Sequence, residues 1–258
     1  MKTYALVTGA SKGIGRSIAH NLAKRGFNLL LVARSEKELS ALQQDLITKF
    51  TISVEILVLD LSIPQASFKL KEWISTNSFP ISVLINNAGY GLWGNFEKLD
   101  LEAQTNMLQL NINTVVELTY LLLPLLRQQE KAFVMNIAST AAYQAVPTLA
   151  LYSASKSFVL SFTRALRFEL KDSPVSVTCV SPGPVDTGFA ARAGLNAFSK
   201  MAEKFNMKPD EVAGIAVKGM LSGKSEIIPG ITNVISAYAN RFLPKSFIEK
   251  TAAGIYKV

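Results

Sequence analysis

The 258-residue chain contains a single cysteine and a single histidine. The lone Cys179 excludes an internal disulfide bond and any metal site built from several cysteines. It lies in the apolar run VSVTCVS, which favours a buried, unreactive thiol. His20 falls in the helical pattern RSIAHNLAKRG, and no second histidine exists to complete a histidine-based metal site. Its setting indicates no catalytic triad either, so we expect no metal.

Clusters of one charge are also lacking. Lysine and arginine number 27 against 19 aspartates and glutamates, which gives a formal charge of +8, but the basic residues are scattered. Such an excess can indicate an anionic partner, or it can serve solubility alone. Without a basic run or a stripe of aromatic and basic residues, we expect no nucleic-acid partner.

No stretch of 18 apolar residues occurs, so the sequence predicts no membrane-spanning helix. The first apolar run, in MKTYALVTGA, is short and is interrupted at Gly9, which argues against a signal peptide. We therefore expect a soluble cytoplasmic protein. Its length suits one large α/β domain better than two small ones.

Short apolar runs alternate with helical patterns along the chain. The runs are apolar throughout, as in parallel strands that are covered on both faces. They span residues 4–8, 28–33, 54–60, 82–86, 133–138, 175–180 and 226–229. Helical patterns cover residues 14–26, 35–50, 66–76, 101–126 and 152–171. This alternation predicts one α/β domain over residues 1–258, with a doubly wound sheet and helices on both faces.

Three glycines, Gly9, Gly13 and Gly15, follow the first predicted strand in the segment TGASKGIGRS. In α/β folds this turn is where a dinucleotide pyrophosphate meets the N-terminus of a helix. The spacing G-x3-G-x-G matches the familiar G-x-G-x-x-G only loosely, and any tight turn can use glycine. Position and composition together nevertheless predict phosphate binding.

The second predicted strand ends in VARSEKEL, where an NAD-binding protein would carry an acidic residue. Arg34 stands there instead, and its planar guanidinium suits a 2′-phosphate. Lys12, in the glycine turn, offers a second positive charge. Each residue alone is also compatible with a solvated surface charge, the less favoured interpretation, and together they favour NADP(H) over NAD(H). Asp60 either meets the adenine edge or caps the following helix.

Tyr152 and Lys156 are four residues apart in the helical segment LYSASKSF. This spacing places both side chains on one helix face. They form either a stabilising pair or an acid–base couple, because a nearby ammonium favours the phenolate. An acid–base couple suits carbonyl reduction, in which a developing alkoxide needs a proton donor and a fixed hydrogen bond.

The motifs TGASKGIG, NNAG at 86–89, Ser139 and YSASK at 152–156 occur in this order. With them the chain closely resembles the short-chain dehydrogenase/reductase family over essentially its whole length. The resemblance implies a single Rossmann-type domain with a seven-stranded parallel sheet, acting as a homodimer or homotetramer. Ala142 departs from the pattern, since many relatives carry glycine there, and its methyl group should narrow only the substrate side.

Roles for individual residues follow from that resemblance. It implies Tyr152 as general acid/base, Lys156 as the group that lowers the pKa of this phenol and binds ribose, and Ser139 as the holder of the substrate carbonyl. Asn111 would hold a proton-relay water. Cofactor contacts are expected from Gly9, Ser11, Lys12, Gly13, Ile14, Gly15, Arg34, Asp60, Leu61, Asn87, Ala88, Gly89, Tyr152, Lys156, Pro182, Gly183, Val185 and Thr187.

The substrate side is expected in three apolar segments. Residues 89–96 supply Tyr90, Leu92 and Trp93, residues 142–147 supply Tyr143 and Val146, and residues 188–207 read as a lid with Phe189, Phe198, Met201 and Phe205. These residues suggest an apolar carbonyl substrate, although such stripes often serve packing or subunit contacts. Residues 230–258 form a substrate or interface segment, with membrane contact the less favoured alternative.

We therefore expect an NADPH-dependent carbonyl reductase, or an alcohol dehydrogenase that catalyses the reverse reaction. Its sequence motifs most resemble those of the ketoacyl and steroid reductases. A non-catalytic NADP-sensing regulator on the same fold is the alternative. It would need only the cofactor half of the site, so the presence of Ser139, Tyr152, Lys156 and Asn111 argues against it. Epimerase or dehydratase chemistry on a nucleotide sugar would call for a larger C-terminal region.

Overall fold

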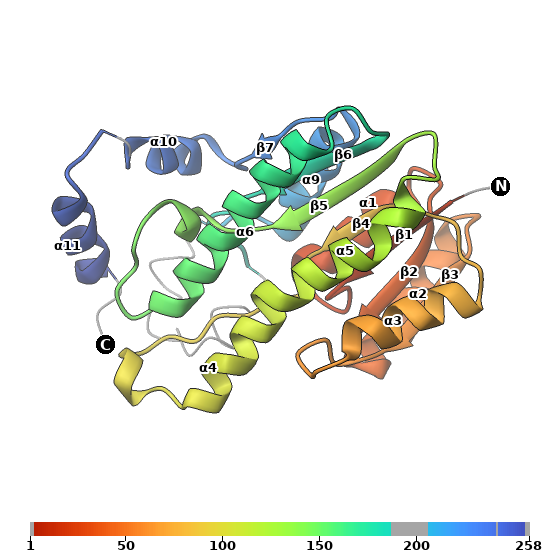
Figure 1. Ribbon diagram of the computed structural model, residues 1–258, viewed down its shortest axis with the longest axis horizontal. Helices are drawn as coiled ribbons and strands as arrows, with labels where there is room; N and C mark the ends of the chain where they lie inside the picture. Colours follow the sequence, from red (N-terminus) through yellow and green to blue (C-terminus); the bar gives the residue numbers. More distant parts are fainter. Residues whose placement is uncertain (1–2, 187–205, 241, 256–258) are drawn as a thin grey trace.

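The computed structural model describes residues 3–186, 206–240 and 242–255 (Figure 1). Its centre is a seven-stranded sheet in the order β3-β2-β1-β4-β5-β6-β7, and every pairing is parallel. The strands are β1 (Tyr4–Thr8), β2 (Asn28–Ala33), β3 (Val54–Val58), β4 (Ile81–Asn86), β5 (Ala132–Ile137), β6 (Val175–Val180) and β7 (Glu226–Ile227). The doubly wound parallel sheet that the sequence predicted is confirmed.

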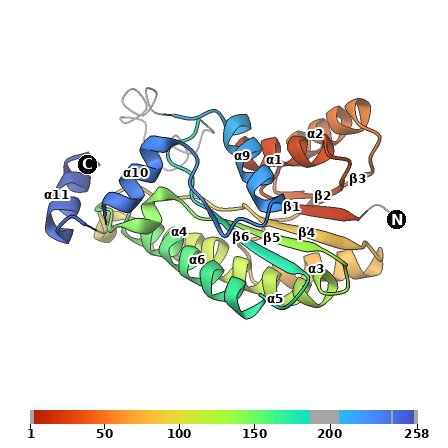
Figure 2. The same ribbon diagram turned by 90° about the horizontal axis from the view of Figure 1, so that it is seen from above.

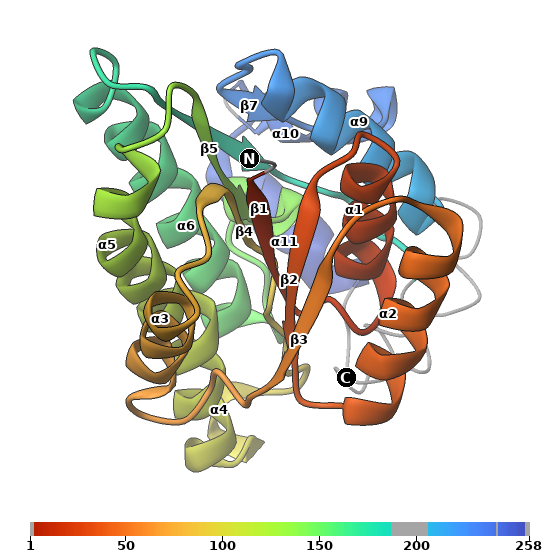
Figure 3. The ribbon, with the colours of Figure 1, turned by 90° about the vertical axis from the view of Figure 1, so that its right-hand side faces the viewer.

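Helices cover both faces of the sheet (Figure 3). One layer holds α1 (Gly13–Ala23), α2 (Glu36–Lys49) and α9 (Pro209–Leu221), and the other holds α3 (Ala66–Thr76), α4 (Leu101–Leu108), α5 (Thr114–Leu126) and α6 (Ala150–Glu169). Two further helices, α10 (Ile231–Ala239) and α11 (Lys245–Ile255), lie at one end of the molecule (Figure 2).

The core consists of two apolar layers, one on each face of the sheet. Alternate residues of β1 and β2 point to opposite faces: Leu29 and Leu31 pack toward α1 and α2, and Leu30 packs toward α3 and α5. All six residues of β2 are buried. Burial on both faces explains why these strands read as unbroken apolar runs.

The helical pattern at 101–126 is interrupted in the structure. Between α4 and α5 the chain forms a π-helical turn, η2 (Gln109–Asn113), which contains Asn111. Such turns are rare and often mark functional sites. The last predicted strand, 226–229, is only two residues long, because Pro229 and Gly230, with φ +88°, turn the chain into α10.

Helix α9 packs against the core and was not predicted by the sequence analysis. It begins at Pro209, a favourable first helical position, and packs against α1. Asp210 accepts a hydrogen bond from the Ser17 hydroxyl at 2.5 Å across this contact. Among the helices in the described ranges, none combines the length and apolar character needed to cross a membrane.

Candidate active site

The glycine turn lies between β1 and α1, beside the point where the strand order changes from β1 to β4. In such sheets ligands bind at this point, outside the carboxyl ends of the strands. Gly9 and Gly13 have φ values of +66° and +55°. A Cβ at Gly15 would lie 2.3 Å from the carbonyl oxygen of Gly9. The turn therefore has room for backbone only, which fits a pyrophosphate brought close to main-chain N–H groups.

The segment after β4 is fastened to the glycine turn. The Asn87 carboxamide donates to the carbonyls of Thr8 and Gly9, at 2.9 and 3.2 Å. The Thr8 hydroxyl accepts from the main-chain N–H groups of Asn87 and Ala88, at 3.0 and 3.1 Å. The glycine turn and the segment after β4, both predicted to contact the cofactor, are thus hydrogen-bonded to each other. The sequence analysis did not single out Thr8, although a threonine at the carboxyl end of a buried strand could have been recognised as a candidate site residue.

The predicted ribose end carries two exposed ion pairs. Arg34 Nη1 lies 3.4 Å from Asp60 Oδ2, and Lys12 Nζ lies 3.2 Å from Glu38 Oε1. Partial burial opposes ionisation of Asp60, but hydrogen bonds from Ser62 and Arg34 outweigh it and lower the pKa of this carboxyl. Each predicted cation therefore has an acidic neighbour of its own.

Asp60 does not cap α3, because Gln65 is the N-cap of that helix. Its Oδ1 instead accepts from the N–H and hydroxyl of Ser62, at 2.9 and 2.6 Å. Leu61 is buried in the core layer under α3 and α5, so only its backbone remains for a cofactor.

Tyr152 and Lys156 are both buried on α6, at 8% and 6% exposure. The Lys156 Nζ lies 5.9 Å from the centroid of the Tyr152 ring and donates to the carbonyl of Ile137 at 2.9 Å. The helix register therefore brings the phenol and the ammonium into one site. Burial lowers the pKa of Lys156 to about 8.

Asn111 lies beside the same ammonium. Its Oδ1 accepts from the Tyr90 N–H at 3.1 Å, and its Nδ2 donates to the Tyr90 carbonyl and to Ser155 Oγ, at 2.9 and 3.1 Å. A Cβ at Gly89 would lie 2.9 Å from Asn111 Oδ1 and 3.4 Å from Lys156 Nζ. Glycine at position 89 thus leaves open the space between these two groups.

Ser139 caps the short 3₁₀ helix η3 (Thr140–Tyr143), and its hydroxyl oxygen accepts from the Ala141 N–H at 3.1 Å. A hydroxyl that accepts in this way keeps its proton for donation to another group. Ala141 packs against the apolar cluster that contains Tyr152, so η3 borders the Tyr152 site.

The loop after β6 carries the predicted cofactor residues Pro182, Gly183 and Val185. Pro182 accepts from the Thr140 N–H at 2.9 Å, and Val185 pairs with Met207. A Cβ at Gly183 would lie 2.3 Å from Asn233 Oδ1, so α10 sits directly against this glycine. Thr187 and the proposed lid residues Phe189, Phe198, Met201 and Phe205 lie outside the described residues.

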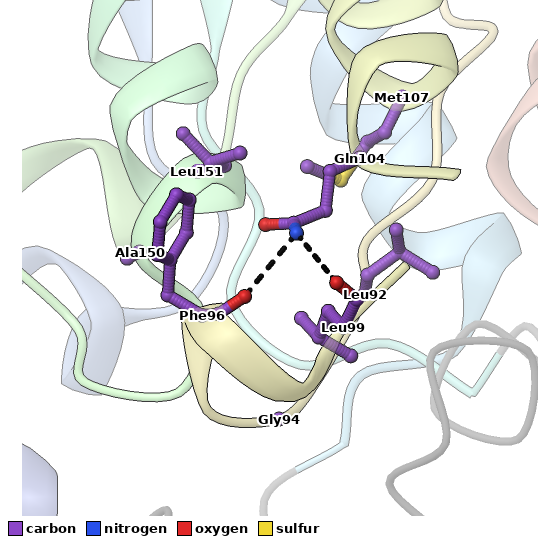
Figure 4. Close-up of a pocket in the computed structure, with 8 residues that line it drawn as sticks. All are labelled: Leu92, Gly94, Phe96, Leu99, Gln104, Met107, Ala150 and Leu151. Atoms are coloured by element: carbon purple, nitrogen blue, oxygen red, sulfur yellow. Dashed lines mark hydrogen bonds between the residues drawn. The ribbon is translucent and has the colours of Figure 1, made fainter. Parts of the chain in front are cut away.

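Apolar side chains surround Tyr152 on the substrate side. They are Met107, Val146, Leu149, Tyr90, Leu92, Trp93, Ala141 and Leu151. The neighbouring loop is held by Gln104, which donates to the carbonyls of Phe96 and Leu99, at 3.3 and 3.0 Å, beside a small cavity (Figure 4). Tyr143, expected here, instead packs against the cluster of Ala138, Val159 and Cys179.

Cys179 lies in β6 and is fully buried. Burial raises the pKa of its thiol to about 11, which agrees with the unreactive thiol that the sequence predicted.

A family model described as short chain dehydrogenase matches residues 3–197. The chain belongs to the short-chain dehydrogenase/reductase family. It is therefore an oxidoreductase that acts on CH–OH or C=O groups. This dehydrogenase is 30% identical over 244 residues to human 17-beta-hydroxysteroid dehydrogenase type 3, covering 93% of this chain and 77% of the relative.

Two further relatives support this assignment. The mouse very-long-chain 3-oxoacyl-CoA reductase is 28% identical over 94% of this chain and 82% of its own. Among solved structures, a short-chain dehydrogenase from Sphingobium yanoikuyae in complex with NADPH superposes with a TM-score of 0.84, at 28% identity and 95% coverage of both chains. These matches confirm the predicted family and its ketoacyl and steroid reductase group.

Proposed function

We propose that this dehydrogenase is an NADPH-dependent carbonyl reductase, which also oxidises the matching alcohol. The observation that supports this most is the juxtaposition of the buried Tyr152 and Lys156 with Asn111 and Gly89, at the sheet edge that carries the glycine turn. The glycines at 9, 15 and 89 fit a dinucleotide, because a side chain at any of them would meet a neighbouring atom within 3 Å.

When bound, the reduced nicotinamide supplies the hydride. Tyr152 gives its phenolic proton to the carbonyl oxygen as the hydride reaches the carbon, so the product is a neutral alcohol. Ser139 donates a hydrogen bond to the same oxygen and stabilises the developing negative charge. The Lys156 ammonium favours the phenolate that is left, lowers the pKa of that phenol and also binds the ribose. Asn111, which lies beside the Lys156 ammonium, holds a relay water against it.

The ribose end favours NADP(H). The ion pairs of Arg34 and Lys12 are exposed, and such pairs contribute about 0–1 kcal/mol each. Breaking either ion pair to turn the cation toward a 2′-phosphate therefore costs little. The charge-assisted hydrogen bond to phosphate that would replace it is stronger than the exposed ion pair. The NADPH in the Sphingobium relative is consistent with this choice.

Replacing Arg34 by alanine should weaken NADPH binding by roughly 10- to 100-fold, the value of a hydrogen bond to a charged group. NADH, which lacks the 2′-phosphate, should bind within about 2-fold of the wild type, since no charged contact is lost. Titration of the fluorescence of each bound dinucleotide gives both dissociation constants. The exposed Arg25, whose guanidinium donates to Asn21 on α1, provides the control Arg25→Ala. Equal losses for the two dinucleotides would show that Arg34 does not select the cofactor.

The substrate side favours an apolar ketone. Tyr152 is surrounded by apolar side chains, and two relatives are named for a hydroxysteroid and for a very-long-chain 3-oxoacyl-CoA. A panel assayed by NADPH absorbance should show kcat/KM at least about 10-fold higher for a steroid ketone or a long-chain 3-oxo thioester than for a short oxo acid. Reaction with short charged ketones alone would overturn this substrate class. Tight NADPH binding with no ketone reduced would favour the sensor alternative.

The remaining parts of the proposal concern the whole molecule. Residues 230–258 complete the substrate mouth or a subunit interface, whereas the lid expected at residues 188–207 lies almost entirely outside the described residues. In support, Gly183 and Asn233 bring α10 against the cofactor-side loop. The protein works in the cytoplasm as a homodimer or homotetramer.

A further inference from the structure

A second tyrosine close to the site forms a polar cluster that the chemistry above does not use. The Tyr143 hydroxyl makes a short hydrogen bond to Glu226 and lies 3.3 Å from Ser181 Oγ. The other oxygen of Glu226 accepts from Arg164, whose Nε lies at 2.8 Å. These four residues come from η3, the end of β6, β7 and α6.

The single phenolic proton decides the direction of these bonds. Glu226 accepts from Arg164 as a carboxylate, so the Tyr143 hydroxyl donates its hydrogen bond to Glu226, and the Ser181 hydroxyl donates to the phenol oxygen. Burial and this carboxylate raise the pKa of Tyr143. Tyr143 is thus held neutral with its proton engaged, and it does not compete with Tyr152 as the acid.

The cluster fastens the turn that carries Ser139. The backbone of this turn is fixed by the bond from Thr140 to Pro182 at 2.9 Å, and by the Ser157 hydroxyl, which donates to the Ala142 carbonyl at 2.8 Å. Both contacts lie near the start or middle of η3. Tyr143, the last residue of η3, fastens its far end through the hydroxyl.

Glu226, to which Tyr143 is bonded, is held at the sheet by both main chain and side chain. Strand β7 is only two residues long, and beside β6 the main-chain N–H groups of Cys179 and Ser181 donate to the carbonyls of Ser225 and Ile227, at 2.9 and 2.8 Å. Arg164, two turns after Lys156 on α6, adds an ion pair in which its Nε and Nη2 both donate to Oε2 of Glu226, and the side chain of Glu226 is only 15% exposed. Helix α6, which carries Tyr152 and Lys156, is thereby tied to the turn that carries Ser139.

We infer that Tyr143, through its bond to Glu226, is a positioning residue that sets the Ser139 hydroxyl relative to Tyr152. This role rests on the proposed carbonyl reduction. Tyr143 itself touches neither the substrate nor the reacting atoms.

The test is a double-mutant cycle between Tyr143→Phe and Ser139→Ala. Phenylalanine keeps the ring packed against Ala138, Val159 and Cys179 and removes only the hydroxyl. A displacement of Ser139 by a fraction of an ångström should lower kcat for ketone reduction by about 10-fold. The NADPH dissociation constant should stay within about 2-fold of the wild type, because no predicted cofactor contact is altered. In the Ser139→Ala background, Tyr143→Phe should change kcat by less than about 2-fold, since the group it positions is gone.

The half-buried Tyr4, at the opposite end of the sheet, provides the control Tyr4→Phe, which should leave kcat unchanged. An unchanged kcat in Tyr143→Phe, or an equal loss with and without Ser139, would overturn the inference. Loss of the melting transition or of NADPH binding in Tyr143→Phe would show a general folding role and would overturn it too. No turnover by the wild type would overturn the proposed function, and this inference with it.

Discussion

Tyr152→Phe should lower kcat for ketone reduction by about 1,000-fold, because general acid catalysis by a positioned group contributes about 10²- to 10⁴-fold. The ring should remain packed against Met107, Val146 and Leu149, so the variant should fold like the wild type. NADPH should bind within a few-fold of the wild type, roughly the value of one lost hydrogen bond. Steady-state rates, measured with an apolar ketone and NADPH, provide the readout.

The matched control is Tyr120→Phe on α5, where the side chain is 78% exposed. It loses the same hydroxyl far from the site and should keep the wild-type rate. A Tyr152→Phe variant that retains the wild-type kcat would rule out Tyr152 as the proton donor.

Lys156→Met should abolish turnover and yet stabilise the cofactor-free protein. Burial holds the pKa of Lys156 at about 8, below its ordinary value of 10.5. At neutral pH the folded protein therefore carries a buried charge, which lowers its free energy of unfolding by roughly 3 kcal/mol. Methionine removes this cost and forfeits the hydrogen bond to the Ile137 carbonyl, worth about 1 kcal/mol. The net gain should be about 2 kcal/mol at pH 7.

The pH dependence of this gain follows from the lowered pKa. Between pH 8 and 10.5 the unfolded chain binds more protons at Lys156 than the folded protein does, so the stability of the wild type rises with pH across this window. The advantage of Lys156→Met should accordingly be full below pH 8 and disappear toward pH 10.5. Urea unfolding at several pH values measures it, with the exposed Lys69→Met on α3 as control. A variant less stable than the wild type at pH 7, or a difference independent of pH, would contradict this account.

The strands could be predicted well from the sequence for a clear physical reason. In a parallel sheet that is covered on both faces, each strand must be apolar throughout, and the sequence shows this directly. The ends of β3 and β7 were less predictable. The run at 226–229 is interrupted by Pro229 and Gly230, whose backbone turns the chain into α10.

Helix α9 was not predicted, although its sequence carries a readable helical pattern. Its buried apolar residues recur at helical spacing and are Val212, Ala213, Ala216, Val217 and Met220. Only the close approach of α9 to the sheet depends on the fold, since a Cβ at Gly219 would lie 2.3 Å from Ile227 Cδ1.

The candidate site was predictable where its residues are neighbours along the chain. The spacing of Tyr152 and Lys156 on one helix fixes their approach, and the three glycines of the turn are close neighbours in the sequence. The π-helical turn at Asn111 was not predictable, since its residues continue a helical pattern. Nor was the bond from Tyr143 to Glu226, which joins residues 83 positions apart.

The central claim is that Tyr152 protonates a ketone oxygen while the adjoining carbon receives hydride from bound NADPH. The most direct measurement uses NADPH that carries deuterium at the transferable position of the nicotinamide, with an apolar ketone and mass spectrometry of the product. We predict an alcohol with one deuterium on the former carbonyl carbon, formed by the wild type and nearly absent with Tyr152→Phe. An alcohol without deuterium, or equal labelled product from both proteins, would contradict the account.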